Sequence, residues 1–360
     1  MGMKNTIRIG LGTLYLILST PLFSQDIHFS QYNFSPLTLN PALTSAYKDI
    51  QATLQYKDQW KVLNAYRTAA FTFEMKFGQP NWKKIDKLTG AFKKKLLKGL
   101  AWGMNVYTDK AGDASIKSSQ ASLSLAYHSL LNEHNTLSLG LMGGIAQHSI
   151  TPDQLRWNNQ YSSSGYDPNI DPGESFSDQS FIYGDYMGGI LWSYGDGSHY
   201  MTSNDQKHIN AGVSLSHFSK PKQSFLGTSD ELLNWKYTVH ANSLFGIKNT
   251  NYSVGPSVLY MNQGALNELT LGMVMKYMLK EDSKYTGYVK GAAFSLGCYY
   301  RNKDAVIPYF LMEMGAYSLG VSYDTNVSGL TAVTSGRGGL EISLRFNTPS
   351  PFLYQNKSRI

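Results

Sequence analysis

Hydrophobic and polar residues alternate with a period of two in many separate stretches of this chain. In one of them Leu123 and Leu125 alternate with Ser122, Ser124 and Ala126. Successive side chains of a strand point to opposite faces, so this pattern predicts strands with one apolar and one polar face.

The alternation predicts about fourteen strands, most of them longer than strands in soluble sheets and suited to a tilted membrane crossing. After the N-terminus, no apolar run approaches the length of a membrane-spanning helix. Lipid cannot pair backbone polar groups, so this many strands must close on themselves. We therefore predict an all-β fold, a transmembrane antiparallel outer-membrane β-barrel over residues 49–346. Its strands lie near 49–59, 67–77, 99–110, 115–131, 136–150, 181–195, 208–220, 234–247, 252–264, 266–279, 286–301, 306–313, 316–325 and 337–346. A soluble sandwich or propeller also alternates, but no blade-length repeat is present.

The N-terminus has the order of a secretory signal peptide. Lys4 and Arg8 precede an apolar run from Ile9 to Leu18, and small and polar residues end at Ser24. We expect residues 1–24 to be a cleaved signal. Residues 25–48 would then be a periplasmic or plug segment before the barrel, and residues 347–360 a C-terminal tail.

Connection lengths predict how the barrel is oriented. With both barrel ends in the periplasm, the long connections 151–180, 221–233 and 326–336 fall outside, as in outer-membrane barrels. Residues 78–98 are the exception, a long basic periplasmic segment that could meet lipid phosphates or an acidic periplasmic partner, or be merely solvated. Its lysines include Lys83, Lys84, Lys87, Lys93, Lys94 and Lys95. Aromatic residues near strand ends are expected to form interfacial girdles: Trp60, Trp102, Trp192, Tyr194, Trp235, Tyr237, Tyr260 and Tyr309.

Charge and motifs exclude several classes of function. The formal net charge of +7 is mildly basic and partly clustered, so it does not indicate nucleic-acid binding. No Gly-x-Ser-x-Gly turn supplies a hydrolase nucleophile, and the histidines show no metal-ligand spacing. We therefore predict a protein that is not an enzyme and has no cofactor.

Short motifs in a fixed order resemble the PorP/SprF family, membrane proteins associated with the type IX secretion system of Bacteroidetes. They are Gln25-Asp26-Ile27-His28-Phe29-Ser30-Gln31-Tyr32, Leu39-Asn40-Pro41-Ala42, Thr108 to Gly112, Leu125 to His128, Ala211 to His217, Gly255-Pro256-Ser257, Tyr300-Arg301, Ser322-Tyr323-Asp324 and Glu341 to Leu344. The resemblance spans nearly the whole mature chain. The lysine-rich segment and the tail depart from the family pattern.

The resemblance implies an outer-membrane protein that binds, anchors or delivers a secreted surface protein. Its expected partners are an adhesin, such as a gliding adhesin, or that adhesin's C-terminal domain, with periplasmic type IX secretion components and outer-membrane lipid. The alternative is a passive porin or solute transporter. Paired inward charges and a docked N-terminal segment would favour the anchor, whereas single-channel conductance would favour the porin.

The predicted loop 151–180 carries two candidate sites. Trp157, Tyr161, Tyr166 and Phe176 lie among polar residues, the composition of a binding surface, although a lid over the barrel is an equal alternative. Asp167, Asn169 and Asp171 have the alternating oxygens of a calcium loop, but nearby prolines favour a stiffened loop. For Asp167, Asn169 and Asp171 we prefer the proline-stiffened loop to a calcium site.

A third candidate site lies in the closing strands. The alternation points Asp324, Glu341 and Arg345 inward, because charged groups on the lipid face would be costly. We expect a lumenal charge network there, which would tune ion passage in a porin or bind a plug in an anchor.

Overall fold

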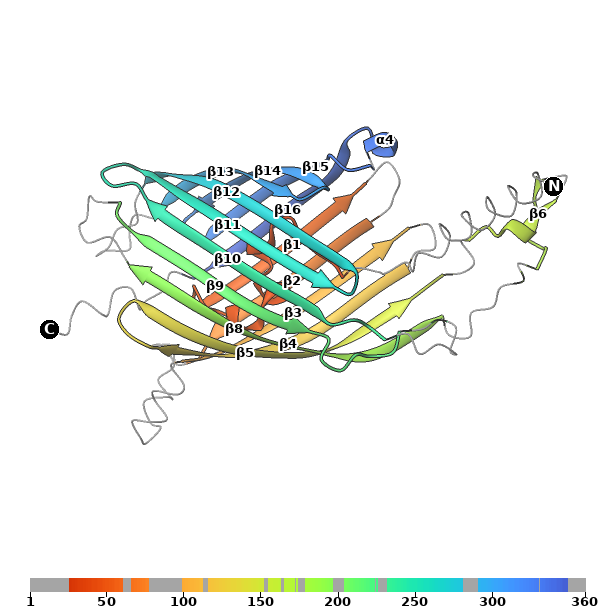
Figure 1. Cartoon of the computed structure of the whole chain (residues 1–360), viewed down its shortest axis with the longest axis horizontal. Coiled ribbons are helices and arrows are strands. Elements are labelled where there is room, and N and C mark those ends of the chain that lie inside the picture. Colours follow the sequence, from red (N-terminus) through yellow and green to blue (C-terminus); the bar gives the residue numbers. More distant parts are fainter. Residues whose placement is uncertain are drawn as a thin grey trace, which may run out of the picture.

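Fourteen antiparallel strands form one closed barrel, in which β1 pairs with both β2 and β16 (Figure 1). The structure is a computed structural model that describes residues 26–60, 66–77, 99–112, 116–151, 155–162, 165–171, 173, 179–196, 204–223, 225, 232–280, 291–329 and 331–348. The barrel strands are β1 (Ile50–Gln59), β2 (Tyr66–Lys76), β3 (Leu100–Ala111), β4 (Ile116–Leu130), β5 (Asn135–Ser149), β8 (Ser180–Asp196), β9 (Lys207–Ser216), β10 (Lys236–Gly246), β11 (Tyr252–Gln263), β12 (Leu266–Lys280), β13 (Ala292–Arg301), β14 (Ala305–Met314), β15 (Tyr317–Asn326) and β16 (Arg337–Asn347). The predicted all-β barrel of about fourteen strands is confirmed.

The observed strands depart from the sequence prediction at several places. β13 begins at Ala292, within the strand expected at 286–301, of which residues 286–290 lie outside the described residues. The strand expected at 208–220 ends at Ser216, because His217 and Lys220 have φ angles of 62° and 41° that no strand residue adopts. A short hairpin of β6 (Tyr161–Ser162) and β7 (Gly165–Tyr166) stands within the connection expected to be a loop.

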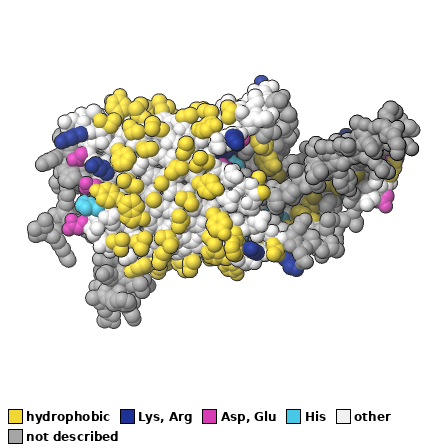
Figure 2. All heavy atoms as spheres, in the orientation of Figure 1, with side chains coloured by type: hydrophobic (Ala, Val, Ile, Leu, Met, Phe, Trp, Pro, Cys, Tyr) yellow, Lys and Arg dark blue, Asp and Glu magenta, His cyan; other side chains and the backbone are white. Residues whose placement is uncertain are grey.

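The strands bury their polar side chains inside the barrel and expose their apolar side chains on its outside, the reverse of a soluble protein. Along β4, Ser122 and Ser124 are buried inside the barrel, whereas Leu123 and Leu125 are 62% and 56% exposed on its outer face. Apolar side chains cover much of the visible outer wall (Figure 2). Exposed apolar residues at every second position suit a wall in contact with lipid.

The barrel has two ends, which we call terminal and distal. Consecutive antiparallel strands of even number place the start of β1 and the end of β16 together, at the terminal end. The connection from β5 to β8 leaves the distal end, carries η6 (Asn158–Gln160), β6 and β7, and projects well beyond the barrel (Figure 1). Another distal connection carries the short helix α4 (Thr331–Thr334).

Residues 26–48 lie inside the barrel, and we call them the lumenal segment. The segment contains η1 (Tyr32–Phe34), α2 (Pro36–Leu39) and η2 (Pro41–Leu43), and strands surround it (Figure 1). No helix of the described residues is long and apolar enough to cross a membrane.

One predicted girdle residue lies on the wrong face. Tyr309 is only 7% exposed and points into the lumen, where its ring meets Tyr299 edge-on at 5.6 Å between centroids. In β14 the alternation buries Ala305, Ile307 and Tyr309 together. Tyr309 stands in the middle of β14, not near its end, and belongs to the buried apolar cluster inside the barrel.

Candidate functional site

The lumenal segment consists of three single helical turns. Pro36 and Pro41 begin α2 and η2, where a fixed φ favours the helix start and no N–H is missed. The side chain of Asn40 accepts a hydrogen bond from the backbone N–H of Ala42 at 2.9 Å. Such short turns are not stable alone, so the barrel wall must hold them in place.

The segment crosses the lumen from one end to the other. Asp26 contacts His217 and Gln263, which lie at the distal ends of β9 and β11. Ser45 donates its backbone N–H to Glu74, near the terminal end of β2, at 2.5 Å. The chain therefore enters at the distal end and descends to the terminal end, where β1 begins.

Arg301 centres a buried charge cluster on the inner wall. Its guanidinium lies 2.9 Å from Asp304, 3.3 Å from Asp324 and 3.5 Å from Glu268, and it donates to Ser30 Oγ at 2.9 Å. Arg301 is 3% exposed. Removing one partner of such a buried pair leaves an uncompensated charge, so the arrangement of Arg301 and its carboxylates is costly to disturb. Ser30 is held in place by its bond to this arginine.

Glu341 binds the backbone of the lumenal segment beside this cluster. Its carboxylate accepts hydrogen bonds from the N–H groups of Ser30 at 2.8 Å and Gln31 at 3.0 Å. Lys57 is 2% exposed and lies 3.6 Å from Asp324. Two adjacent backbone donors directed at one carboxylate define a single docked geometry for the segment.

His217 links the start of the segment to the distal rim. Its ring nitrogens lie 2.6 Å from Asp26 and 2.8 Å from Asp185, and Lys236 lies 3.5 Å from Asp26. Burial alone would lower the pKa of His217, but the two carboxylates outweigh it and raise this pKa to about 9. Burial alone would raise the pKa of Asp26, but His217 and Lys236 hold it well below its usual range. The pair is ionised at neutral pH.

Glycines let the segment approach the wall on the opposite side. A Cβ atom at Gly189 would lie 2.1 Å from Asn40 Oδ1, and one at Gly140 would lie 2.2 Å from the backbone nitrogen of Ala42. Asn40 also donates to the carbonyl oxygen of Ile190 at 3.0 Å. The lack of side chains at Gly140 and Gly189 therefore leaves the space that the lumenal segment occupies.

An apolar cluster fills the middle of the lumen. Tyr32 meets Tyr299 edge-on at 5.7 Å between ring centroids, and Leu39 and Leu43 are 5% and 4% exposed. The cluster joins these residues to the inner faces of β8, β11, β13 and β14. The segment is thus held by packing in its middle and by polar contacts at both ends.

The three predicted lumenal charges all reach the segment, but not as one group. Asp324 accepts a hydrogen bond from Ser30 Oγ at 2.6 Å, close to Glu341. Arg345 lies apart from them, donates to the carbonyl oxygen of Asn33 and stacks on the Phe34 ring at 4.0 Å.

Sequence reasoning missed Arg301, Lys57, His217 and Asp26 as members of this site. Lys57 stands at an inward position of β1, between outward Tyr56 and Asp58, so alternation could have found it. No local pattern could have paired Asp26 with His217, which is 191 residues away.

Three of the four predicted aromatic residues of the β5–β8 connection, Trp157, Tyr161 and Tyr166, lie in a small folded unit that we call the distal hairpin (155–162 and 165–171). Tyr161 and Tyr166 pack at 5.5 Å between ring centroids, and the Arg156 guanidinium lies 5.0 Å from the Tyr166 ring. Tyr161 is 53% exposed, and Trp157 is half-buried.

Other predicted site residues are placed differently. Asp167 Oδ1 accepts hydrogen bonds from the Asn169 backbone and side chain, and Asp171 Oδ1 accepts one from the Gly173 N–H, so both carboxylates cap local turns. Within the described part of the chain, no group of three or more acidic, histidine or cysteine side chains is placed to hold a metal ion. Residues 1–25, Phe176, residues 349–360 and the predicted basic segment with Lys83, Lys84, Lys87, Lys93, Lys94 and Lys95 lie outside the described residues.

The chain matches the sequence model of a known protein family. The model of the type IX secretion system membrane protein PorP/SprF matches residues 22–346. No curated protein matches the chain significantly.

Solved structures that resemble the barrel are distant in sequence. A KdgM porin in complex with disordered oligogalacturonate is 6% identical with a TM-score of 0.36, and covers 83% of this chain and 99% of its own. BamA from Haemophilus ducreyi lacking POTRA domains 1-3 is 10% identical with a TM-score of 0.39, over 83% and 70% of the two chains. The TodX deltaS2S3 mutant monoaromatic hydrocarbon channel is 7% identical with a TM-score of 0.43, over 87% and 93%.

Proposed function

Because this chain belongs to the PorP/SprF family of type IX secretion system membrane proteins and is an outer-membrane barrel, we propose that it holds a secreted surface protein at the cell surface without passing it through its lumen. The partner is an adhesin engaged through its C-terminal domain. The protein is not an enzyme in this proposal. It supplies a fixed support in the membrane and a binding surface outside it.

The single observation that carries this proposal is the occupied lumen. Residues 26–48 cross it from end to end, and buried Arg301, Glu341 and His217 hold them there. A passive porin needs a continuous aqueous path, whereas an anchor needs a wall that does not change shape. The docked segment and the paired inward charges therefore favour the anchor over the porin.

The orientation follows from the barrel's ends. Outer-membrane barrels keep the start of the first strand, the end of the last strand and their short turns in the periplasm, so the terminal end faces the periplasm and the distal end faces outside. The distal hairpin then stands outside the cell with Tyr161 exposed and Trp157 half-buried. Aromatic rings among polar groups are common in protein-binding surfaces, so we assign the partner to this hairpin.

The test is retention of a surface protein after purification in mild detergent. We would purify wild-type protein and the Trp157→Ala/Tyr166→Ala double variant from the native outer membrane and quantify co-purifying proteins by mass spectrometry. We expect one large secreted protein with wild type and at least a tenfold loss with the variant. The control, Tyr300→Ala/Tyr323→Ala, removes two exposed rings from the outer wall and should retain the partner.

Two results would contradict the proposal. Equal retention by the hairpin variant would remove the hairpin from the binding surface. A purified wild-type barrel that carries no partner and conducts ions steadily in a planar bilayer would establish the porin instead.

A further inference from the structure

Three basic side chains stand in one row on the outer wall. Arg67, Lys110 and Lys117 occupy β2, β3 and β4, and the register places Arg67 opposite Lys110 and Lys110 opposite Lys117. All three are exposed at outward positions near the distal end. Like charges directly opposite each other destabilise a sheet, so an anion bound along the row would offset their repulsion.

The two lysines of the row differ from Arg67 in their described partners. Arg67 Nε lies 4.0 Å from Asp58 Oδ1, a long ion pair whose arginine is 53% exposed. Lys110 and Lys117 form no ion pair with any other residue that the structure describes. A row of basic residues at the membrane boundary, with two ammonium groups that no described acidic side chain pairs, is suited to bind phosphate.

The row is confined to one side of the barrel. At the distal end of the other wall, the outward positions are occupied by exposed tyrosines on β10, β11, β13 and β15: Tyr237, Tyr260, Tyr300 and Tyr323. Tyrosine rings are the usual residues at a membrane interface. Other exposed bases at the distal end, Lys220, Lys303 and Arg337, lie on separate connections or strands, so Arg67, Lys110 and Lys117 are distinguished by lying side by side on three paired strands.

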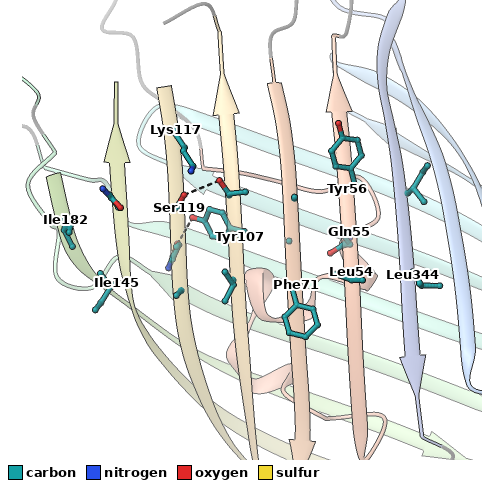
Figure 3. A pocket seen from close by; sticks show the side chains of 18 residues that line it. Leu54, Gln55, Tyr56, Phe71, Tyr107, Lys117, Ser119, Ile145, Ile182 and Leu344 are labelled. Carbon is teal, nitrogen blue, oxygen red and sulfur yellow. Dashed lines mark hydrogen bonds between the residues drawn. The ribbon is translucent and has the colours of Figure 1, made fainter. Parts of the chain in front are cut away.

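The wall is hollowed directly below the row. The next outward positions on β2, β3 and β4 are small, namely Ala69, Thr108, Ser119 and Ala121, and Thr108 and Ser119 bond to each other at 3.2 Å. Larger side chains border them on both sides, and Leu54, Tyr56, Phe71, Ile145, Ile182 and Leu344 are labelled in Figure 3. The hollow has a volume of about 820 Å³ and is open to the outside.

The hollow and the basic row are continuous. A second hollow of about 550 Å³ is lined by Arg67, Lys110 and Lys117, and shares Tyr56 and Ala69 with the first. The outer wall thus presents phosphate-binding chemistry toward the distal end and an apolar recess toward the middle of the membrane. A charge on the lipid face is tolerated near the interface but costs about 2–4 kcal/mol at the midplane, which places the row at the headgroup level.

We propose that this surface binds a phosphorylated glycolipid of the outer leaflet. Its phosphate lies against Arg67, Lys110 and Lys117, and an acyl chain lies in the hollow over Ala69 and Ala121. The distal end faces outside, so the bases lie at the leaflet where such a glycolipid has its phosphates. This site is on the outer wall and is independent of the lumenal segment and of the distal hairpin.

The test measures lipid retained by the whole protein. Wild-type protein and Lys110→Glu/Lys117→Glu would be incubated in mild detergent with bisphosphorylated lipid A, and the lipid-bound fraction read by native mass spectrometry. We expect at least a tenfold lower bound fraction for the variant. Lipid A with its phosphates removed should bind wild type as poorly. The control, Lys207→Glu/Lys248→Glu, reverses two exposed charges at the terminal end and should bind like wild type.

A second variant tests the hollow separately. Ala121→Trp fills it from an outward position and should lower lipid retention several-fold, while Leu271→Trp, at an exposed outward position of β12, should not. Heat-modified mobility in gels would show that each barrel is folded. Equal binding of lipid A by wild type and the lysine variant, or equal binding of phosphorylated and phosphate-free lipid, would overturn the proposal. Cargo retention by the hairpin is unaffected in either case.

Discussion

The lumenal segment and the distal hairpin are both irregular pieces of chain, but they are held in opposite ways. Ser30 bonds to Glu341, 311 residues away, and Asn40 bonds to Ile190, 150 residues away. In the hairpin, Gln160 bonds to Ile170 within ten residues, and Tyr161 packs on Tyr166. The first is fixed by the whole barrel. The second folds on itself and leaves aromatic surface exposed.

This difference suits two tasks. A segment fixed by distant strands cannot move without disturbing the barrel, so it seals and stiffens the lumen. A hairpin whose described contacts join residues close in sequence can adjust to a partner at little cost to the fold. The predictions below test whether the segment and the hairpin differ in this way.

The largest effect is expected when a central charge of the lumenal site is removed. Arg301→Met keeps roughly the volume but leaves Glu268 and Asp324 buried without the guanidinium that contacts both of them. We expect the free energy of unfolding in detergent micelles to fall by about 3–5 kcal/mol, as for other broken buried ion pairs. Guanidinium-induced unfolding followed by fluorescence would measure it.

The matched variant in the hairpin is Arg156→Met. Arg156 lies over the Tyr166 ring at 5.0 Å and is exposed, so its loss should cost at most about 1 kcal/mol. Similar losses for the two arginine variants would mean that the lumenal segment is no more tightly held than the hairpin.

A smaller effect is expected from crowding the segment's contact with the wall. Gly189→Val places a side chain where Asn40 now lies, and should displace η2 at a cost of about 1–3 kcal/mol. Gly184→Val on the same strand is the control, because its nearest neighbour, the Tyr186 hydroxyl, is 3.5 Å from the new Cβ. Amide hydrogen exchange of residues 38–46 should rise only in the first variant. Unchanged exchange would show that the approach at Gly189 is not restrictive.

The barrel could be predicted from the sequence because its signal is local. Alternation of Leu123 and Leu125 with serines depends only on neighbouring residues, and lipid outside the barrel enforces it on every strand. Asp324 and Glu341 were predicted to face inward on the same basis. The position of residues 25–48 was left open between plug and periplasm.

The rest of the site could not be predicted, because its partners are brought together only by closure of the barrel. Nothing near Gly189 in the sequence indicates that Asn40 will lie against it. The girdle prediction for Tyr309 is wrong because this residue stands in the middle of β14, at an inward position of the strand's alternation. His217 has a left-handed backbone just after β9, which ended that strand four residues before the predicted boundary.

A pH change is expected to loosen only the distal end of the lumenal segment. The folded pKa of His217, about 9, lies above its ordinary value of 6.5. The stabilisation from its charged form is therefore complete below about pH 6.5 and is lost as pH rises through about 9. Asp26, Asp185 and Lys236 face this ring. A nitroxide on Ile27→Cys, in a Cys298→Ser background, should gain mobility between pH 7 and 10.

The same label in a His217→Gln background provides the control for this titration. Glutamine cannot carry the charge, so the mobility of the Ile27→Cys nitroxide should be high throughout and independent of pH. A pH step that persists in that background would show that another group holds the start of the segment.

The smallest effect on stability, and a large one on binding, is expected in the distal hairpin. Tyr161→Ala removes a ring that is 53% exposed and contacts mainly Tyr166, so the free energy of unfolding should change by about 0.5 kcal/mol or less. Retention of the secreted partner should nevertheless fall several-fold, because exposed aromatic rings contribute strongly to protein interfaces. Tyr32→Ala in the lumenal segment should do the reverse, since Tyr32 is buried against Tyr299. It should destabilise the barrel by about 3 kcal/mol and leave the intact molecules able to hold the partner. If both variants lowered stability and retention in proportion, binding would depend on the fold as a whole, and the division of tasks between the two regions would be wrong.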